Sequence, residues 1–213
     1  MSQFKEFLSQ YPLETFDKGQ VILLAGDTPR GVYIVESGLV KTYTISLNGN
    51  ECLMSIDGRE TQFPLGFASG VIDKSNFYYE AYNRCRIRIV PKDDYSEHLR
   101  SDVDSLYARH LRMTIQLMSM FERIRALEQP RASGKVARTL LYMASRVGSV
   151  FGAQSNSTNL KITQQEIANL LGLSRETASA ELKNLELKKL IRYSRKNYTI
   201  YTQKIEEYVE DQE

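Results

Sequence analysis

The chain has 213 residues, of which 42% are hydrophobic and 25% charged, a composition typical of a globular protein with one large or two modest domains. It contains no run of about 18 apolar residues, and its first residues lack the basic start and apolar stretch of a signal peptide. We therefore expect a cytoplasmic protein without a membrane span. The net charge of +2 is uneven: residues 133–204 carry a net +8, which leaves −6 for the remainder. Such a basic part suits a module that binds phosphates, although it also suits a solvated surface.

The first segment, residues 1–92, is a series of short alternating runs separated by turn residues. The runs QVILLAG, GVYIVESG, LVKTYTIS, ECLMSI, FYYEAYN and CRIRIVP are typical of strands. Asn48-Gly49 predicts a hairpin between two of them, because both residues tolerate positive φ. Short strands at this spacing predict a β-sandwich or barrel. Cys52 and Cys85 are isolated from each other and from histidine, which favours reduced thiols over a disulfide or a metal site.

The second segment, residues 93–129, has a helical period. Its apolar positions form a heptad seam over four heptads: Val103, Leu106, His110, Met113, Leu117, Met120, Ile124 and Leu127. This regularity favours a parallel homodimeric coiled coil over a helix that packs only on its own domain. His110 would either fix the register of the two helices or simply be tolerated beside the seam. Leu111 and Met118 lie off the seam, and we expect them to dock the helix on the strand domain.

The third segment, residues 130–213, begins after Pro130, which should end the preceding helix. VARTLLYMASRV predicts an amphipathic helix, GSVFGAQSNSTN a loop and Leu160–Ile162 a short strand. IRYS and YTIY predict a hairpin around Arg195-Lys196-Asn197. The last residues, IEEYVEDQE, are acidic, and we expect them to be frayed or peripheral.

The run TQQEIANLLGLSRETASAELKNLELKKLI predicts a helix-turn-helix. Thr163 and Glu166 form the pattern of a capping box, Gly172 stands where a left-handed residue must end the first helix, and Ser174 is placed to cap the second. The apolar residues at helical spacing are Ile167, Ala168, Leu170, Leu171, Leu173, Ala178, Leu182 and Leu185. With the hairpin that follows, the pattern indicates a winged module that binds double-stranded DNA rather than a helical hairpin with a solvated polar face.

The candidate DNA-binding residues follow from this geometry. The first residues of the second helix reach base edges in the major groove, where Arg pairs with guanine and Glu accepts from cytosine. We therefore expect Arg175 and Glu176 to read bases. The remaining candidates are outer-face and cap residues (Ser174, Ser179, Lys183), phosphate contacts (Thr163, Gln164, Gln165, Thr177) and the wing turn (Arg195, Lys196).

At these residues the chain resembles the cAMP receptor protein / fumarate-nitrate regulator (Crp–Fnr) family of bacterial transcription factors. LSRETASAELKNLE is similar to the family's recognition helix, and FDKGQVILLAGD and GVYIVESGLVKTY are similar to its jelly-roll strands. The resemblance implies an α+β chain: a jelly-roll, cyclic-nucleotide-binding-like sensor domain (1–92), a dimerisation helix (93–129) and a winged helix-turn-helix domain (130–213). It also implies a homodimer on a palindromic site, with RNA polymerase as a further partner if the protein activates transcription.

Three departures from the family pattern bear on the signal and the operator. Ala180 stands where the family usually has another base-contacting Arg, so one contact is missing. Gly66-Phe67-Ala68-Ser69 and Asn76-Phe77-Tyr78-Tyr79 replace the family's Gly-Glu-Leu and Arg-Ser runs, so we expect no cAMP binding, because a buried phosphate needs a cation. No cysteine precedes Cys52, which argues against an iron–sulfur cluster, and the four residues available as haem ligands (Cys52, Cys85, His98 and His110) do not favour haem.

The identity of any effector stays open at this stage. The candidate residues are Gly66, Phe67, Ala68, Ser69, Phe77, Tyr78 and Tyr79. They would either line a pocket for an apolar or aromatic ligand or fill that space as core, and we favour the core.

Two other functional classes are disfavoured. Metal-dependent cupin enzymes share the jelly roll, but their sites need two or three histidines, and residues 1–92 contain none. We therefore expect no enzymatic activity, metal or cofactor. A ligand-sensing signalling module that does not bind DNA is the alternative function, and it would require a degenerate helix-turn-helix.

Overall fold

The structure, a computed structural model, describes residues 3–211 except 48, 50 and 149–155. The chain divides into two compact units, one formed by Met1–Thr44 with Ser55–Met118 and the other by Ile45–Met54 with Ser119–Glu213. The long helix α3 (Val103–Leu127) contributes residues to both. Among the helices described, none combines the length and the apolar character needed to cross a membrane.

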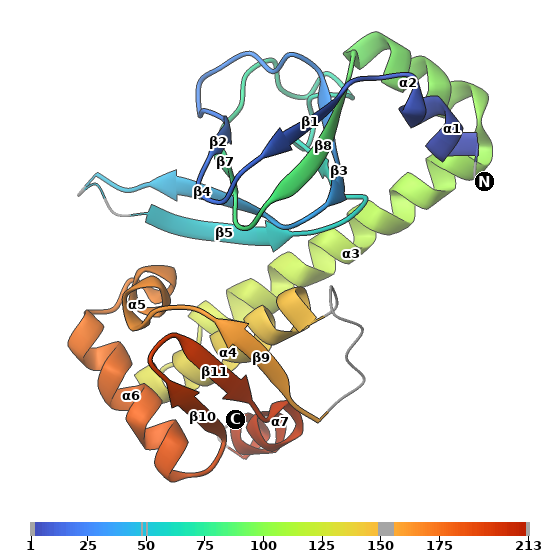
Figure 1. Ribbon diagram of the computed structural model, residues 1–213. Coiled ribbons are helices and arrows are strands. Elements are labelled where there is room, and N and C mark those ends of the chain that lie inside the picture. Colours follow the sequence, from blue (N-terminus) through green and yellow to red (C-terminus); the bar gives the residue numbers. More distant parts are fainter. Residues whose placement is uncertain (1–2, 48, 50, 149–155, 212–213) are drawn as a thin grey trace. The chain divides into compact units, whose positions relative to one another are not determined.

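Two four-stranded sheets with antiparallel strand pairs belong mainly to the first unit (Figure 1). They form the β-sandwich that the strand spacing predicted, with the jelly-roll fold that the family resemblance implied. One sheet has the order β1 (Leu13–Phe16), β8 (Cys85–Val90), β3 (Val32–Ser37), β6 (Gln62–Phe63). The other has the order β2 (Val21–Leu23), β7 (Tyr78–Ala81), β4 (Val40–Ile45), β5 (Glu51–Asp57). All six predicted strands are present, and β1 and β6 are additional. The strands β4 and β5 are neighbours, as predicted, although Asn48 of their turn lies outside the described residues.

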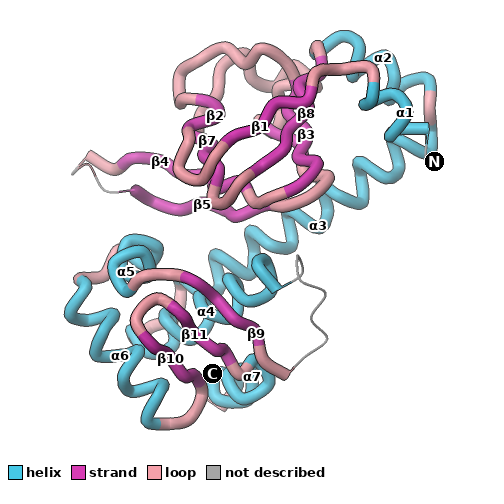
Figure 2. The backbone as a smooth tube through the Cα atoms, viewed as in Figure 1, coloured by secondary structure: helices cyan, strands magenta, loops and turns pink. Residues whose placement is uncertain are grey.

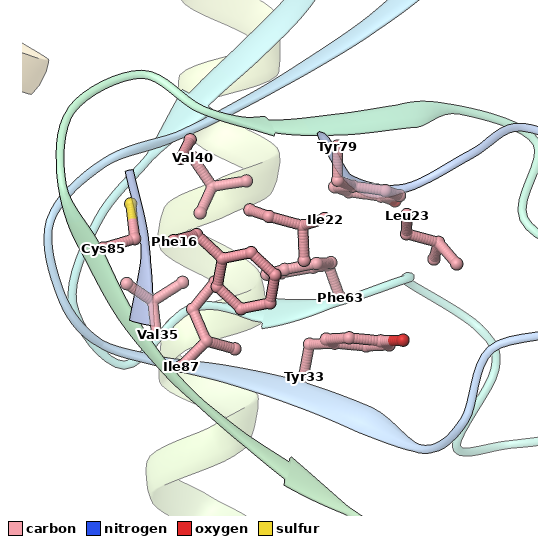
Figure 3. Packing of buried hydrophobic residues seen from close by; sticks show 11 residues of the cluster. Phe16, Ile22, Leu23, Tyr33, Val35, Val40, Phe63, Tyr79, Cys85 and Ile87 are labelled. Carbon is pink, nitrogen blue, oxygen red and sulfur yellow. The ribbon is translucent and has the colours of Figure 1, made fainter. Parts of the chain in front are cut away.

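Aromatic rings fill the space between the two sheets (Figure 3). The ring of Phe63 stacks on Tyr33, with centroids 5.1 Å apart, and on Tyr79, with centroids 4.5 Å apart. Around them lie the other buried members of this core: Phe16, Ile22, Leu23, Val35, Val40, Ala81, Cys85 and Ile87. The interior of the jelly roll is therefore packed with side chains of its own.

A second hydrophobic cluster lies on the other face of β3. Val32 and Ile34 point away from Tyr33 and Val35 because side chains alternate along a strand. They pack with residues of the short helix α1 (Gln3–Ser9), of α2 (Lys92–Ser101), of the loop after β6 and of the end of β8: Phe4, Leu8, Tyr95, Phe67 and Val90.

The segment predicted as a single helix forms two, α2 and α3, separated at Asp102. The backbone of Asp102 is extended, with φ −124° and ψ 99°, which ends α2. Its carboxylate then accepts hydrogen bonds from the backbone N–H of Asp104 (3.2 Å) and from the hydroxyl of Ser105, as a helix N-cap does. The hydrogen bond from the Ser105 hydroxyl lowers the pKa of Asp102. Loss of water around the carboxylate opposes this shift, whereas the backbone N–H groups of Ser105 and Asp104 and the nearby His98 add to it. An apolar period cannot reveal such a break, because the cap is a polar residue outside the apolar stripe.

The expectation that Leu111 and Met118 dock α3 on the strand domain is wrong, because both side chains are exposed. The buried face of α3 in the first unit is polar instead. The guanidinium of Arg109 is buried and donates to the carbonyl of Glu60 (2.6 Å), and Arg112 forms an ion pair with the carboxylate of the same Glu60.

The second unit combines helices with a three-stranded sheet (Figure 2). The sheet has the order β10 (Ile191–Ser194), β11 (Asn197–Ile200), β9 (Thr158–Lys161). The helices are α4 (Ala132–Gly148), α5 (Gln164–Leu171), α6 (Arg175–Leu187) and α7 (Thr202–Glu210). The predicted loop GSVFGAQSNSTN falls largely outside the described residues. The last segment, expected to be frayed or peripheral, forms the helix α7, which buries Ile205 and Val209 at a helical spacing of four.

Candidate nucleic-acid interface

The first helix of the helix-turn-helix, α5, begins with the predicted capping box. The hydroxyl oxygen of Thr163 accepts a hydrogen bond from the backbone N–H of Glu166 at 3.1 Å, and the backbone N–H of Thr163 donates to the Glu166 carboxylate at 2.6 Å. Two of the N–H groups that a helix start leaves unpaired are thereby satisfied. The start of α5 is therefore fixed by local hydrogen bonds whose residues can be identified from the sequence.

The turn between the two helices has the conformation predicted for it. Gly172 adopts φ +62°, a left-handed conformation that an L side chain rarely takes, and this ends α5. Two residues later, the hydroxyl of Ser174 accepts from the backbone N–H of Thr177 at 3.1 Å and caps α6. Leu173 between them is half-buried.

The inner faces of α5 and α6 pack on each other through apolar side chains. Six of the predicted core positions are buried: Ile167, Ala168, Leu171, Ala178, Leu182 and Leu185. Leu170 is only half-buried. Because this core holds the inner face, it leaves the opposite face of α6 in solvent. Arg175, Glu176, Thr177, Ala180 and Lys183 are exposed, and Ser179 is half-buried.

The wing is a hairpin whose tip is Arg195-Lys196. Ser194 pairs with Asn197, so these two exposed basic residues form the whole turn. Arg195 has φ +56°, and the carbonyl of Lys196 accepts from the backbone N–H of Ile162 at 2.9 Å. The tip is thus held against the segment that leads into α5.

A tyrosine that the sequence did not single out lies behind the start of α5. The ring of Tyr198 is buried and stacks on Tyr193, with centroids 5.1 Å apart, and its hydroxyl lies beside the side chain of Gln164. Burial raises the pKa of Tyr198 to about 12, Tyr193 adds to the shift and Gln164 opposes it. Tyr198 therefore packs behind the start of α5, next to the candidate phosphate contact Gln164. Its strand pattern alone marks it only as core.

The positive charge of this segment is carried mainly at its surface. Eight basic side chains of the sheet, of its wing turn and of α6 with its C-terminal turn are exposed: Lys161, Arg175, Lys183, Lys188, Lys189, Arg192, Arg195 and Lys196. Arg138 of α4, by contrast, is buried. Residues 133–204 contain four acidic residues, and two of them are also engaged: Glu166 in the cap of α5, and Glu186 as acceptor for the backbone N–H of Tyr193 at 3.3 Å. The exposed surface therefore favours a polyanion.

The face of α3 that carries the predicted seam is exposed. Seven seam residues are exposed and Met120 is half-buried. Of the 18 large hydrophobic side chains that are exposed among the described residues, 11 belong to this one helix. An apolar patch concentrated in this way is typical of an interaction surface.

The residues proposed to line an effector pocket do not come together in one cluster. Phe77 and Tyr79 belong to the core between the sheets, whereas Phe67 and Ala68 pack in the second cluster with α1 and α2. Tyr78 points away from Tyr79 and stacks on Tyr43, with centroids 5.2 Å apart. Gly66 and Ser69 lie in the loop after β6, where the hydroxyl of Ser69 donates to the carbonyl of Gly66 at 3.3 Å.

Two profiles of known protein domains match this chain, one in its N-terminal part and one in its C-terminal part. Residues 13–102 match the profile of the cyclic nucleotide-binding domain, and residues 134–206 match the Crp-like helix-turn-helix domain. The anaerobic regulatory protein of Pasteurella multocida (strain Pm70) is 29% identical over 187 residues, 86% of this chain and 66% of the relative. The cAMP-activated global transcriptional regulator CRP of Escherichia coli O157:H7 is 24% identical over 197 residues, 92% of each chain.

Among solved structures, the c-di-GMP-responsive global regulator CLP of Xanthomonas campestris superposes with a TM-score of 0.77. It is 20% identical, and the match covers 93% of this chain and 97% of CLP. The matches run through the jelly roll, the long helix and the helix-turn-helix in the same order. The chain therefore belongs to the Crp–Fnr family of transcription regulators, with the α+β fold and the helix-turn-helix DNA-binding domain of that family.

Proposed function

We propose that this regulator binds a palindromic DNA site as a homodimer and does so without cAMP. The observation that carries the proposal is the exposed, capped start of α6, where Arg175 and Glu176 project from the helix terminus that enters a major groove in helix-turn-helix proteins. The exposed apolar seam of α3 supports a second copy as its partner, because a twofold dimer places two such helix termini on two half-sites.

The residues divide into base readers and phosphate contacts. Arg175 pairs with a guanine and Glu176 accepts from a cytosine, whereas Lys183 and the wing residues Arg195 and Lys196 hold the backbone. Thr163, Gln164, Gln165 and Thr177 add neutral phosphate contacts. Ser174 acts through its cap, since its hydroxyl already accepts from Thr177. Ala180 offers no donor, so the operator differs from that of relatives with Arg at this position.

The test is selection of bound DNA from a random library, followed by two single variants. The selected sites should be palindromes whose half-sites lie about one helical turn apart. Arg175→Ala should relax the preference at one base pair of each half-site, at a cost of roughly 1–3 kcal/mol in discrimination. Lys196→Ala should weaken binding to all sequences about equally and flatten the salt dependence. An equal loss on every DNA from Arg175→Ala would remove Arg175 from the base readers.

The lack of a cAMP response rests on the chemistry of the sensor. Neither residues 66–69 nor residues 76–79 contain a Lys or Arg to pair with a buried phosphate, and Phe67 and Tyr79 are already buried in hydrophobic clusters. The relatives CRP and CLP are named for responses to cAMP and c-di-GMP. A ligand that binds only the native state raises the melting temperature as its concentration increases. For this chain we expect no such rise with either nucleotide. A concentration-dependent rise with cAMP would refute this part of the proposal.

The proposal places the protein in the cytoplasm, where chromosomal DNA and RNA polymerase are found. If it activates transcription, RNA polymerase is the second macromolecular partner. Its action requires binding and release of DNA and no chemical step of its own.

A further inference from the structure

Within the second unit, α3 carries a buried arginine that the heptad pattern ignores. Arg123 is only 4% exposed, and its guanidinium lies among residues of two other helices. One terminal nitrogen donates to the backbone carbonyl of Leu170 in α5, and the other lies 3.4 Å from the hydroxyl of Thr139 in α4. The ring of Tyr142, also in α4, lies 6.0 Å from the guanidinium carbon. Burial lowers the pKa of Arg123 by removing water from the charged group, and the nearby Tyr142 opposes that shift.

The carbonyl that Arg123 binds is one that the helix end itself does not satisfy. The last four carbonyls of an α-helix have no partner within the helix. In α5 the left-handed turn satisfies two of these carbonyls, because the N–H of Gly172 donates to the carbonyl of Asn169 and the N–H of Leu173 donates to that of Ala168. The carbonyl of Leu170 receives the guanidinium instead. A cation at this position also complements the negative end of the helix dipole.

We propose that Arg123 is the positioning residue that fixes α5, and with it the recognition helix α6, on the dimerisation helix α3. The helices α5 and α6 share one apolar core, so a contact that orients α5 orients α6 as well. In the dimer of the proposed function, on which this inference rests, the two α3 helices lie side by side. The Arg123 contact in each subunit then sets the spacing and angle of the two α6 helices.

The chemistry of the contact suits this role better than apolar packing would. A guanidinium is a planar group with donors in fixed directions, so it binds a carbonyl in one orientation, whereas an apolar side chain packs in several. A buried ion is a poor stabiliser, since an apolar residue of similar volume is often equally good or better. Loss of Arg123 should therefore disturb the orientation of α5 and α6 more than it lowers the stability of the fold.

The experiment compares Arg123→Met and Arg123→Lys with the unchanged protein on four DNAs at one salt concentration. These are the selected palindrome, the same palindrome with one or two base pairs inserted at its centre, a single half-site, and unrelated DNA. For Arg123→Met we expect a folded dimer with about tenfold weaker binding to the palindrome, from loss of a charged hydrogen bond. Binding to the half-site and to unrelated DNA should be nearly unchanged, and the penalty for the inserted base pairs should shrink.

A matched control is Arg109→Met, which removes a second buried arginine from the same helix. Arg109 donates to the carbonyl of Glu60 within the first unit, so its loss should leave the spacing preference unchanged. Because Arg123 contacts no phosphate, its variants should also keep the slope of affinity against salt.

The inference is overturned if Arg123→Met keeps the affinity and the spacing preference of the unchanged protein, or if it loses affinity equally for all four DNAs. If Arg123→Met does not fold, Arg123→Lys decides, because it keeps the cation at the helix end but lacks the planar fork. A Lys variant with an unchanged spacing preference would then refute the role of the guanidinium. Should the unchanged protein itself show no preference for a palindrome over a half-site, the proposed dimeric function fails instead.

Discussion

The seam of α3 can be tested by removing two of its side chains, Leu117 and Ile124, which lie seven residues apart. They are 51% and 53% exposed in the single chain, so about half of each side chain remains to be buried by a partner. Full burial of such a side chain is worth about 1.5–3 kcal/mol, which gives about 1 kcal/mol for each half. A symmetric interface contains each position twice, so the double variant Leu117→Ala/Ile124→Ala should cost about 4 kcal/mol, or roughly a thousandfold in the dimer dissociation constant.

Sedimentation equilibrium on both proteins measures this constant directly. Alanine keeps the helix propensity high, so α3 should remain formed, which circular dichroism can verify. The matched control is Leu111→Ala/Met118→Ala, a pair on the same helix with the same spacing and similar exposure that lies off the seam. It should leave the dimer intact. A dimer that survives the loss of Leu117 and Ile124 but dissociates in the control would place the interface on the other stripe, and insensitivity of both would exclude α3 as the interface.

Three further predictions concern stability and thiol chemistry. Burial alone would raise the pKa of Glu60, but the hydrogen bond and charge of Arg112, with Arg109 and Arg59, lower it overall. A carboxyl whose pKa is lowered by folding stabilises the folded state above its unfolded pKa, and this stabilisation is lost as the pH falls through the folded pKa. Urea unfolding should therefore show that Glu60→Gln is less stable than the unchanged protein at pH 7. In acid the two proteins should be equally stable. Thr163→Ala should cost about 1 kcal/mol in the same assay through loss of the cap of α5, whereas Thr163→Ser, which keeps the hydroxyl, should cost much less; equal losses would show that the cap hydroxyl is not responsible. Cys52 is exposed, whereas Cys85 is buried. Burial raises the pKa of Cys85 to about 11, although its hydrogen bonds to the carbonyls of Leu39 and Asn83 oppose this shift. A thiol reagent at pH 8 should therefore react with one cysteine per native chain and with two in urea. A native count of zero would point to a disulfide or a bound metal.

The helix-turn-helix was the most predictable part of the chain, because its boundaries are set by local chemistry. Thr163, Gly172 and Ser174 each act on backbone groups within three or four residues, so their roles follow from spacing alone. The strands were predictable for a similar reason, since alternation is a local pattern. The exceptions were β1 and β6, of four and two residues, which are too short to show a period and exist because neighbouring strands pair with them.

Contacts between distant residues account for the parts that the sequence did not predict. Phe67 and Tyr79 belong to runs that family resemblance assigns to one pocket, yet they lie in different clusters. The reason is that the loop after β6 carries Phe67 to the outer face of β3, whereas Tyr79 points between the sheets. Likewise α7 is acidic and looks solvent-exposed, but two apolar residues four positions apart suffice to bury one side of it. Composition describes the average of a segment, whereas packing depends on one face.

The distribution of side chains on α3 is the strongest physical argument for a second copy of the chain. An amphipathic helix that packs only on its own domain buries its apolar stripe and exposes its polar one. On α3 the arrangement is reversed: Arg109, Gln116 and Arg123 are buried, whereas Leu117 and Ile124 are exposed. The period of the sequence reveals the stripe but cannot say which face the domain covers. Because an exposed seam of this kind is unfavourable in water, association should stabilise each subunit, and melting should rise with protein concentration.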